Sequence, residues 1–402
     1  MRADGDGMRH PSRPSRSRQV ATTTPVLAVL AVGLLTFGTT GCATVRRVGP
    51  GHPYATPCQA IAAAKAGDVI DIDAAGNGTY DGDVCGWSTN GLTIRGSNGR
   101  AHIDAAGHHS GGKAIWVIAG NNTVIRNVEL SGATVPDHNG AGIRLEGTNL
   151  TIVGSYFHDN EDGILTGANP NSDVVIDSSE FSGNGHGDGL SHNMYIGTVR
   201  SFTLRSSWSH DANTGHLVKS RALTNHIIGN RLTEQSGTGS YELDLPNGGR
   251  SYVIGNLIQQ GPSSPNSTML QYAAEGAINA NSHLFVINNT FVNDKGSGTA
   301  VGVHSSVTTP VVARNNITTG SPTFVAQASA VLTTNCNVAN PMFVNRAAFD
   351  YHLQAASPCV DAGSAPGTGD GESLTPTDQY VHPTGHEARP VSGVIDAGAY
   401  ER

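Results

Sequence analysis

The feature that most constrains this chain is a repeat. A short apolar run that ends in small polar residues recurs along the middle of the sequence, at Val124–Asn127, Thr151–Ser155, Val175–Ser179, Phe202–Ser207, Ile227–Asn230, Val253–Asn256, Val286–Asn289 and Val311–Asn315. From Val128 to Asn315 the successive spacings are 27, 24, 28, 23, 26, 33 and 26 residues. Propeller blades need about 40 residues per repeat, and leucine-rich repeats need a leucine ladder. The spacing therefore predicts the coils of one solenoid.

A solenoid coil buries its apolar side chains only by stacking on the coils above and below it, so its two ends need covers. The alanine-rich stretch 56–66 predicts a helix that caps the N-terminal end, and residues after about 320 are expected to cover the other end. One polar position recurs in successive coils, at Ser179, Asn230, Asn256, Asn289 and Asn315. We expect these side chains to stack and to bond to each other and to turning backbone, which is a structural role.

Three features resemble the right-handed parallel β-helix proteins of the pectin-lyase-like class. They are the opening Ala60–Asp68 with Gly78-Thr79-Tyr80 after it, the coil repeat, and the ending Ser357–Gly363 with Ile395–Glu401. The resemblance covers nearly all of residues 56–402. It implies an all-β fold, a right-handed parallel β-helix with an N-terminal capping helix. It does not assign an activity, because one fold hosts many functions.

The N-terminal segment predicts export. A positive region with Arg9, Arg13, Arg16 and Arg18 precedes the apolar run Val26–Phe37, which is too short to span a membrane. Gly41-Cys42 resembles the end of a bacterial lipoprotein signal, so Cys42 is the expected lipid attachment site and the only expected contact with a membrane; plain secretion is the alternative. The expected organisation is a signal peptide over 1–41, a tether over 42–55, the β-helix over 56–345 and a C-terminal capping segment over 346–402.

The cysteine count agrees with this organisation. Five cysteines leave one unpaired in an exported chain, and setting Cys42 aside leaves four. The nearest-neighbour pairs are Cys58 with Cys85 and Cys336 with Cys359, and two such bridges would fit an oxidising compartment outside the cytoplasm. Four cysteines allow three pairings, so the pairing stays open at this point.

The net charge limits the partners. The chain carries 24 basic and 32 acidic residues, a formal charge of −8. The first 41 residues hold five arginines and two aspartates, so the remaining chain has a formal charge of −11. This charge argues against nucleic acid. It permits an acidic polysaccharide only if positive charge is gathered in a cleft. We expect a monomer.

The chemistry is expected between Ser191 and Gly249, where one of only four lysines lies near other reactive side chains. The second strands of successive coils there begin at His192, His216, Tyr241 and Met269, and parallel strands lie about 4.8 Å apart. The expected catalytic residues are Lys219, Arg221, His216 and Tyr241. The expected substrate-binding residues are His192, Asn193, Tyr195, Asn247 and Arg250.

Alternation along the strands predicts which side chains face outward. It places Glu242 and Asp244 on the outer face, where their carboxylates could hold Ca²⁺, the one cofactor considered. It also places Lys219 and Arg221 on a common face. Leu217 shares their parity, so only an irregularity near Gly215 or Ser220 turns the two cations outward without exposing Leu217.

Cleavage of a uronic-acid polymer by β-elimination needs a group that neutralises the carboxylate, a base and a proton donor. We expect Arg221 or a bound cation to neutralise the sugar carboxylate and Lys219 to act as the base. The expected proton donor is Tyr241, Tyr195 or His216. The Lys219-Ser220 strand resembles the arrangement in lyases related to chondroitinase B and to some alginate lyases. The arginine of the next coil is replaced here by Tyr241-Glu242-Leu243-Asp244, so Arg221 or Arg250 would have to take its role.

Several alternatives remain open from sequence. A C5 epimerase begins with the same proton abstraction, and a non-catalytic carbohydrate-binding protein of the cell surface fits the acidic net charge. Lys219 and Arg221 could pair with Glu242 and Asp244 as a solvated charge ladder. The two acids could instead serve a glycoside hydrolase. A zinc site at His186 and His192 lacks a convincing ligand set.

Overall fold

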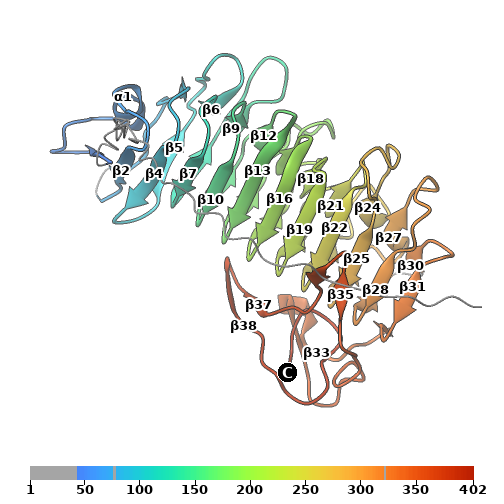
Figure 1. The fold of residues 1–402 in the computed structure, drawn as a ribbon. Helices are drawn as coiled ribbons and strands as arrows, with labels where there is room; N and C mark the ends of the chain where they lie inside the picture. The colour runs from blue at the N-terminus through green and yellow to red at the C-terminus, as the bar shows by residue number, and fades with distance from the viewer. Residues whose placement is uncertain (1–42, 76–77, 321–322) are drawn as a thin grey trace, which may run out of the picture. The chain divides into compact units, whose positions relative to one another are not determined.

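The computed structural model describes residues 43–75, 78–320 and 323–402 and shows a right-handed parallel β-helix, as the sequence predicts (Figure 1). Each coil contributes one strand in turn to three parallel sheets, which we call sheets A, B and C. Within the described residues, sheet A has 12 strands and sheets B and C have 10 each. The predicted all-β class is therefore confirmed.

The strand bounds follow the coils in chain order. Sheet A consists of β1 (Val45–Val48), β2 (Val69–Asp73), β4 (Thr93–Ser97), β7 (Thr123–Arg126), β10 (Leu150–Val153), β13 (Asn169–Asp177), β16 (Val199–Arg205), β19 (Thr224–Ile228), β22 (Arg250–Ile254), β25 (Leu284–Ile287), β28 (Val312–Arg314) and β31 (Val331–Thr333). Sheet B consists of β5 (Ala101–Asp104), β8 (Val128–Ser131), β11 (Tyr156–His158), β14 (Glu180–Ser182), β17 (Trp208–His210), β20 (Arg231–Thr233), β23 (Leu257–Gln260), β26 (Thr290–Asn293), β29 (Ile317–Thr319) and β32 (Cys336–Asn337). Sheet C consists of β3 (Cys85–Trp87), β6 (Ala114–Ile118), β9 (Ala141–Leu145), β12 (Asp162–Thr166), β15 (Met194–Ile196), β18 (Lys219–Ser220), β21 (Leu243–Leu245), β24 (Thr268–Tyr272), β27 (Thr299–Val303) and β30 (Thr323–Ala326).

The core is built from side chains that occupy the same place in successive coils. In sheet A, register places one inward aliphatic residue on the next, in the row Ile94, Ile125, Ile152, Ile176, Leu204, Ile227, Val253, Val286 and Ala313. All of these side chains are buried. In sheet B, the rings of Phe157 and Phe181 stack with their centres 4.8 Å apart. Such contacts recur at every coil, so burial accumulates along the stack.

A ladder of polar side chains, buried except for the partly exposed Asn335 at its end, lies between sheets A and B. Asn256 shows its repeating unit. The Asn256 amide donates to the carbonyl of Ile227 at 2.8 Å, and its Oδ1 accepts from the backbone N–H of Asn230 at 3.0 Å. The members are Ser155, Ser179, Ser207, Asn230, Asn256, Asn289, Asn316 and Asn335.

The predicted stacking of polar side chains is thus confirmed with one change. Asn316, rather than Asn315, occupies the ladder position. Asn315 lies one residue earlier, at the corner where the backbone takes a left-handed conformation (φ +57°). Glycine or asparagine suits that conformation, and Gly229 and Gly255 hold the same place before Asn230 and Asn256.

The N-terminal end carries the expected helix in a shorter form. Helix α1 (Pro57–Ala62) ends four residues before the predicted Ala66, and it buries Pro57, Ala60 and Ile61. Cys58 is bonded to Cys85, which joins the helix to β3. The expected tether over 42–55 is corrected in part, because Val45–Val48 forms β1 and pairs with β2 in sheet A.

The C-terminal segment lies beside the solenoid and does not close its end (Figure 1). The last coil strand is β32, and the Cys336–Cys359 disulfide links it to the following segment. Leu257 and Ile317 of sheet B pack against this segment, while Val331 and Leu332 of the last coil stay about half exposed (48% and 51%). The expected capping role is thus replaced by a flanking one, and the solenoid ends near 337 rather than 345. The remaining elements are β33 (Phe343–Asn345), the 3-10 helix η1 (Arg346–Ala348), β34 (Asp350–Leu353), β35 (Thr368–Gly369), β36 (Glu372–Ser373), β37 (Asp378–Val381) and β38 (Gly385–Ala388).

Among the described residues, no helix has the length and apolar character that crossing a membrane requires.

We expect Asn256→Ala to lower the urea denaturation midpoint and to reduce the free energy of unfolding by about 2–4 kcal/mol, because the substitution leaves buried backbone groups of the neighbouring coil without hydrogen-bond partners. Asn256→Ser should lose less, since serine fills the same ladder position at Ser155, Ser179 and Ser207. Asn171→Ala, at an exposed residue, is the control. Urea denaturation followed by circular dichroism measures all three. If Asn256→Ala and Asn256→Ser reduced the free energy of unfolding equally, the proposed hydrogen-bonding role of this ladder position would be contradicted.

Candidate functional site

The predicted site strands are neighbours in sheet C, and their outward side chains form one row. Tyr195 of β15 lies opposite Lys219 of β18, and Lys219 lies opposite Asp244 of β21. The row continues in the other direction through Leu165 of β12 to Arg144 of β9. We call these five residues the outer row.

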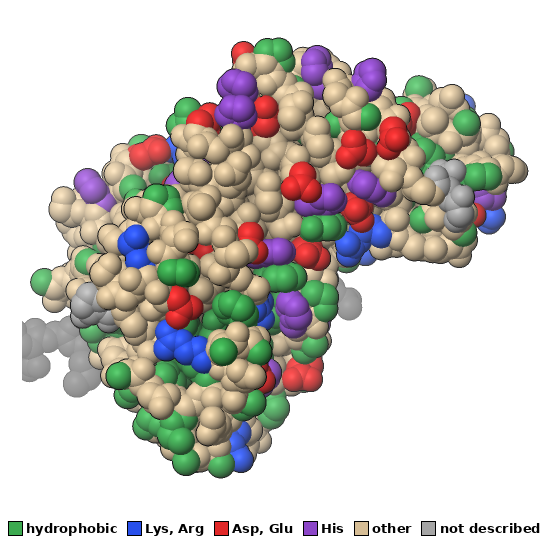
Figure 2. Space-filling model, turned by 180° about the vertical axis from the view of Figure 1, so that it is seen from behind, with side chains coloured by type: hydrophobic (Ala, Val, Ile, Leu, Met, Phe, Trp, Pro, Cys, Tyr) green, Lys and Arg blue, Asp and Glu red, His purple; other side chains and the backbone are tan. Residues whose placement is uncertain are grey.

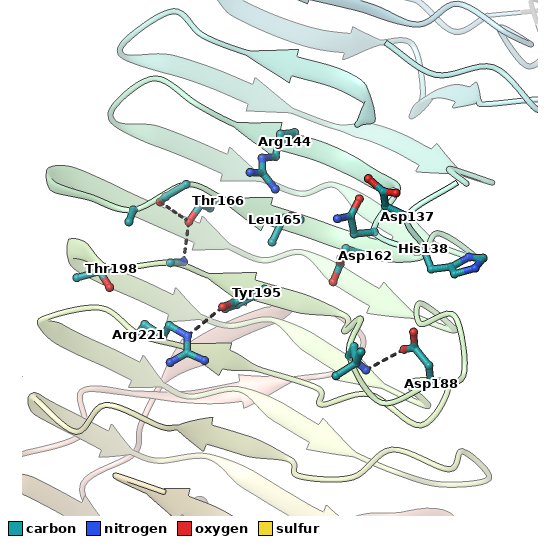
Figure 3. Close-up of a pocket in the computed structure, with 15 residues that line it drawn as sticks. Asp137, His138, Arg144, Asp162, Leu165, Thr166, Asp188, Tyr195, Thr198 and Arg221 are labelled. Atoms are coloured by element: carbon teal, nitrogen blue, oxygen red, sulfur yellow. Dashed lines mark hydrogen bonds between the residues drawn. The ribbon is translucent and has the colours of Figure 1, made fainter. Parts of the chain in front are cut away.

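A groove of about 510 Å³ runs over this part of sheet C (Figure 3). Arg144, Leu165 and Tyr195 of the outer row contribute to it. Loop 132–140, which follows β8, and loop 183–193, which follows β14, flank it with acidic and apolar side chains. The full lining is Asp137, His138, Asn139, Arg144, Asp162, Leu165, Thr166, Gly167, Ala168, Asp188, Leu190, Tyr195, Gly197, Thr198 and Arg221. We call this space the sheet C groove.

Lys219 faces outward, as expected for a catalytic base. Its Nζ lies 5.2 Å from the centre of the Tyr195 ring, and it makes no hydrogen bond or ion pair with any residue that the structure describes. Leu217 and Val218 are both fully buried. Inward and outward side chains therefore stop alternating just before β18, and this irregularity lets Lys219 face outward while Leu217 stays buried. The irregularity lies between Gly215 and Ser220, the two positions that the sequence suggested.

Arg221 is held in place by three partners. Its Nε donates to the Tyr195 hydroxyl at 2.9 Å, its Nη1 donates to Asn247 Oδ1 at 2.8 Å, and its Nη2 donates to Glu275 Oε1 at 2.7 Å. The bonds to Glu275 raise the pKa of Arg221, and the same contact lowers the pKa of Glu275. The charge of Arg221 is therefore compensated. Because the Tyr195 oxygen accepts from Arg221, its own proton is free to point elsewhere.

His192, His216 and Tyr241 occupy the same place in three successive coils and are linked through the backbone. The N–H of His216 donates to His192 Nδ1 at 3.0 Å, and the N–H of Tyr241 donates to His216 Nδ1 at 3.4 Å. Each Nδ1 is thus an acceptor, which places the ring proton on Nε2. Burial lowers the pKa of His192 well below its usual value and that of His216 to about 3. At neutral pH both rings are neutral, so His216 does not supply a proton from an imidazolium.

Asp244 lies beside Lys219 but is almost fully covered. Its Oδ2 is 3.6 Å from His216 Nε2. Burial raises the pKa of Asp244 to about 7, although the nearby Lys219 acts in the opposite direction. The carboxyl therefore changes charge near neutral pH. It modulates the field around Lys219 but does not line the sheet C groove.

Two predicted site residues point into the solenoid, which corrects the alternation argument. Glu242 and Asn193 are both fully buried, together with Leu217 at the same place in the coil between them. Asn193 bonds to interior groups, including the carbonyl of His210 at 2.9 Å. The turn into sheet C brings two consecutive side chains inward in each coil. Strict alternation of inward and outward side chains therefore cannot be extended across this turn.

The expected pair of Glu242 and Asp244 is therefore not assembled. Asp244 belongs to the outer row, whereas the Glu242 carboxyl lies in the interior, where neither oxygen has a hydrogen-bond partner. These two side chains form neither a calcium site nor the acid pair of a glycoside hydrolase. The expected charge ladder is also absent, because Arg221 pairs with Glu275. A calcium requirement at some other place remains a prediction.

Two further predictions concern residues away from the groove. Arg250 begins β22 in sheet A and pairs with Asp370 of the C-terminal segment, with Nε and Oδ2 3.1 Å apart. It is therefore separated from Lys219 and does not replace the missing arginine. Cys42, the expected lipid attachment site, lies outside the described residues.

Sequence reasoning missed Arg144 and Asp162 in the groove. Arg144 makes no hydrogen bond or ion pair in the described part of the chain, and its Nε is buried without a partner. Burial raises the pKa of the Asp162 carboxyl well above its usual value. The signal that could have found Arg144 is the coil repeat itself, because Ala141–Leu145 holds the same place as Met194–Ile196 two coils later.

A cluster of His138, Glu161 and His186 was also missed. It lies at the edge of the sheet C groove. The Nδ1 atoms of His138 and His186 are 3.5 and 3.7 Å from Glu161 Oε1, and the two rings stack face to face with centres 3.7 Å apart. Glu161 Oε2 accepts the N–H of Val135 and the N–H of Gly140, at 3.0 and 2.7 Å. The cluster thus fastens loop 132–140 to the coil beneath it.

Comparisons with known proteins agree with this architecture. A protein-family profile described as a right-handed β-helix region matches residues 84–258. Together with the three parallel sheets, the match shows that the chain has the right-handed parallel β-helix fold. Among solved structures the chain is similar to pectate lyase Pel9A, with a TM-score of 0.61 and 16% identity over 90% of this chain and 98% of that one.

A weaker similarity is found to the Dettilon tailspike protein. The TM-score is 0.35 and the identity 12%, over 69% of this chain and 64% of that one, which is too low to carry an argument. A sequence search of curated proteins finds no match.

We expect Glu242→Gln to stabilise the protein at neutral pH. Burial raises the pKa of the Glu242 carboxyl well above 4.5, so the native state binds this proton more tightly than the unfolded chain does. The stabilising contribution of this group is therefore fully present below about pH 4.5 and is lost as pH rises above that value. The glutamine variant should be more stable than the parent protein at pH 7 and lose this advantage near pH 4.

Thermal unfolding at pH 4, 5.5, 7 and 8 measures the effect, with the exposed Glu146→Gln as the control. A Glu242→Gln variant that is less stable than the parent protein at pH 7 would contradict a raised pKa for the buried Glu242 carboxyl.

Proposed function

We propose that the protein binds an acidic polysaccharide along the sheet C groove and cleaves it by β-elimination. The observation that carries the proposal is the outer row, where the two cations Arg144 and Lys219 are without an ion-pair partner in the described residues and lie on either side of Leu165 and Tyr195. A cation that is partly buried and unpaired in a groove is stabilised when an anionic ligand enters.

The charges of the groove support an anionic ligand despite the acidic net charge of the chain. Burial raises the pKa of the Asp162 carboxyl well above its usual value, so burial disfavours its negative charge beside Arg144. Asp137 and Asp188 lie on the flanking loops (Figure 3). Positive charge is thus concentrated along the sheet, where successive strands are spaced about 4.8 Å apart. A polymer with carboxylates at regular intervals fits such a row when it lies along the solenoid axis.

The outer row contains the groups that β-elimination requires. In its neutral form Lys219 would take the hydrogen next to the sugar carboxylate, while Arg144 or Arg221 would neutralise that carboxylate. The electrons of the broken C–H bond form the new double bond as the glycosidic C–O bond breaks. Tyr195 would give its proton to the leaving oxygen, because its oxygen already accepts from Arg221. Tyr195 replaces His216 as the preferred donor, since the His216 ring is neutral.

A non-catalytic polysaccharide-binding protein is the second candidate. It is favoured by the pairing of Arg221 with Glu275, which leaves no uncompensated arginine next to Lys219. A C5 epimerase would use the same first step and return a proton to the opposite face of the sugar. Export is part of the proposal. The two disulfides support an oxidising compartment, while the signal over 1–41 and lipid attachment at Cys42 remain predictions.

We expect incubation with alginate, pectate, glucuronan or chondroitin, with and without Ca²⁺, to raise the absorbance near 235 nm for at least one polymer, because β-elimination creates a conjugated double bond. Lys219→Ala should lower kcat on that polymer by on the order of 100-fold or more, because it removes the base. Lys65→Ala, at an exposed lysine near the N-terminal helix, should leave kcat unchanged.

Full activity of Lys219→Ala would remove Lys219 as the base. If no polymer gives a rise, proton NMR of the recovered polymer separates the remaining candidates. A change in sugar stereochemistry indicates an epimerase, and an unchanged polymer indicates binding alone.

Polymer binding is tested separately. We expect Arg144→Ala to weaken binding of the preferred oligouronide at least about tenfold at low salt, because it removes an uncompensated positive charge from the groove. Arg126→Ala, at an exposed arginine of sheet A, is the matched control. Isothermal titration calorimetry measures both. Equal affinities for the Arg144→Ala variant and the parent protein would place the binding site elsewhere.

A further inference from the structure

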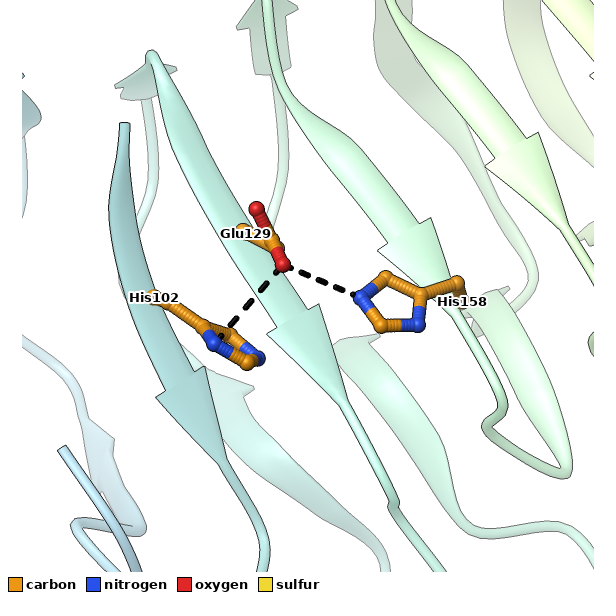
Figure 4. A group of neighbouring side chains, drawn as sticks. All are labelled: His102, Glu129 and His158. Carbon is orange, nitrogen blue, oxygen red and sulfur yellow. Dashed lines mark hydrogen bonds and ion pairs between the residues drawn. The ribbon is translucent and has the colours of Figure 1, made fainter. Parts of the chain in front are cut away.

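A second cluster of reactive side chains lies on the outer face of sheet B, away from the sheet C groove. His102 of β5, Glu129 of β8 and His158 of β11 come from three successive coils and converge (Figure 4). Glu129 Oε1 lies 3.7 Å from His102 Nδ1 and 3.2 Å from His158 Nε2. All three side chains are partly exposed, so the point where they meet is open to solvent.

The proton on His102 is fixed by the residues behind it. His102 Nε2 lies 2.8 Å from Ser131 Oγ, and Ser131 Oγ donates its own proton to Asp104 Oδ2 at 2.6 Å. A hydroxyl has a single proton, so the Ser131 oxygen must accept the N–H of His102 Nε2. Nδ1 of the neutral ring therefore carries the lone pair. The Thr79 hydroxyl, 3.1 Å away, satisfies this lone pair now and can rotate aside.

His158 is oriented in a similar way. Its Nδ1 lies 2.7 Å from Asp159 Oδ2, so Nδ1 donates to the carboxylate. Its ring stacks on Tyr156 with centres 4.4 Å apart, which sets the plane of the imidazole. In the neutral ring, the Nε2 lone pair then faces Glu129. Metal-binding histidines commonly donate their second N–H to a carboxylate or another oxygen in this way.

We propose that His102, Glu129 and His158 bind one Zn²⁺ ion through Nδ1, Oε1 and Nε2. Zinc ligands at about 2.0–2.1 Å in tetrahedral geometry lie roughly 3.3 Å apart, so the observed 3.2 and 3.7 Å separations need only small shifts. Two imidazoles select a zinc-type ion over Ca²⁺ or Mg²⁺, which prefer oxygen ligands. Three protein ligands leave a fourth position for water.

The electrostatic surroundings on this face favour a dication. Asp104 and Asp159 lie directly behind the two histidines, and Arg100 is the nearby cation that acts on Glu129. Seen from behind, histidine side chains lie among acidic ones on the protein surface (Figure 2). The bound ion would link β5, β8 and β11, and so would hold three successive coils together.

The chain contains a natural comparison to this site two coils further on. His210 Nε2 lies 3.3 Å from Glu180 Oε1, His210 Nδ1 lies 2.9 Å from Asp211 Oδ2, and the Trp208 ring stacks on His210. This repeats the Glu129, His158, Asp159 and Tyr156 arrangement. Register places Tyr156 beside Glu180, however, where His102 stands beside Glu129. The second copy therefore lacks the imidazole that His102 supplies. Among the described residues no third ligand atom converges with those of Glu180 and His210, so this copy should not hold the ion.

The cluster of His138, Glu161 and His186 is a weaker candidate for a metal. Its two rings are nearly parallel (16°) and stacked, so the in-plane lone pairs do not converge on one point. The His102 cluster is the one whose proton positions and ligand directions agree.

The test is zinc binding by the metal-stripped, purified chain, measured by isothermal titration calorimetry and by the visible absorption of bound Co²⁺. We expect one ion per chain, a Co²⁺ spectrum of low coordination number, and a rise in the unfolding temperature with added Zn²⁺. His102→Gln and His158→Gln should each weaken binding by more than about 100-fold, since even loss of an outer-shell partner costs about 10–100-fold.

Two variants serve as controls. His210→Gln should leave zinc affinity unchanged, and Ser131→Ala, which keeps both histidines, should weaken it by about 10–100-fold. Circular dichroism shows whether each variant is folded. The proposal is overturned if the folded parent chain binds no zinc, or if His210→Gln weakens binding as much as His102→Gln. Because the readout is metal affinity, the outcome is independent of any activity in the sheet C groove.

Discussion

Hydrogen bonding between one coil and the next is the constraint on which the rest of the structure depends. Parallel strands satisfy most of their backbone groups by pairing with the coils above and below, and the corner between sheets A and B is completed by the ladder from Ser155 to Asn335. The side-chain amide of Asn256 donates a hydrogen bond to a carbonyl of the neighbouring coil and accepts one from an N–H of that same coil. These two bonds fix the register between the coils and also stabilise the stack. A slip of one residue would turn the core side chains outward.

Fixed register is also what assembles both candidate sites. No single coil provides all the side chains of either candidate site. Tyr195 and Lys219 become neighbours only because β15 and β18 pair in register. His102 and Glu129 likewise meet across β5 and β8, and His158 joins them from the following coil. The two clusters lie on different sheets of the same solenoid, so one repetitive scaffold presents the two proposed sites independently.

Much of the fold could be predicted from the sequence, because the repeat is a local pattern that recurs. The coil spacing and the side-by-side site strands follow from this short-range order. The sequence left the pairing of the four cysteines open, and the structure selects the nearest-neighbour pairs. Asn315 was assigned to the ladder instead of Asn316 because one corner contains two asparagines, and only the backbone conformation distinguishes the turn residue from the ladder residue.

The candidate site was less predictable. Strand alternation places Lys219 and Arg221 on a common face without deciding which face that is. It fails for Glu242, because two consecutive residues turn inward where each coil enters sheet C. Arg250 looked available because it follows the site strand closely in sequence, yet it begins a strand of another sheet. Glu275 is far from Arg221 in the chain, and nothing in the pattern shows that it compensates that arginine.

The most direct measurement is a crystal structure of the protein with an acidic oligosaccharide bound. The account predicts an oligosaccharide aligned with the solenoid axis over sheet C, with a carboxylate on Arg144 or Arg221 and with Lys219 Nζ and the Tyr195 hydroxyl on either side of one glycosidic bond. An oligosaccharide on sheet A or B, or one over sheet C that leaves Lys219 out of reach of the sugar, would contradict it.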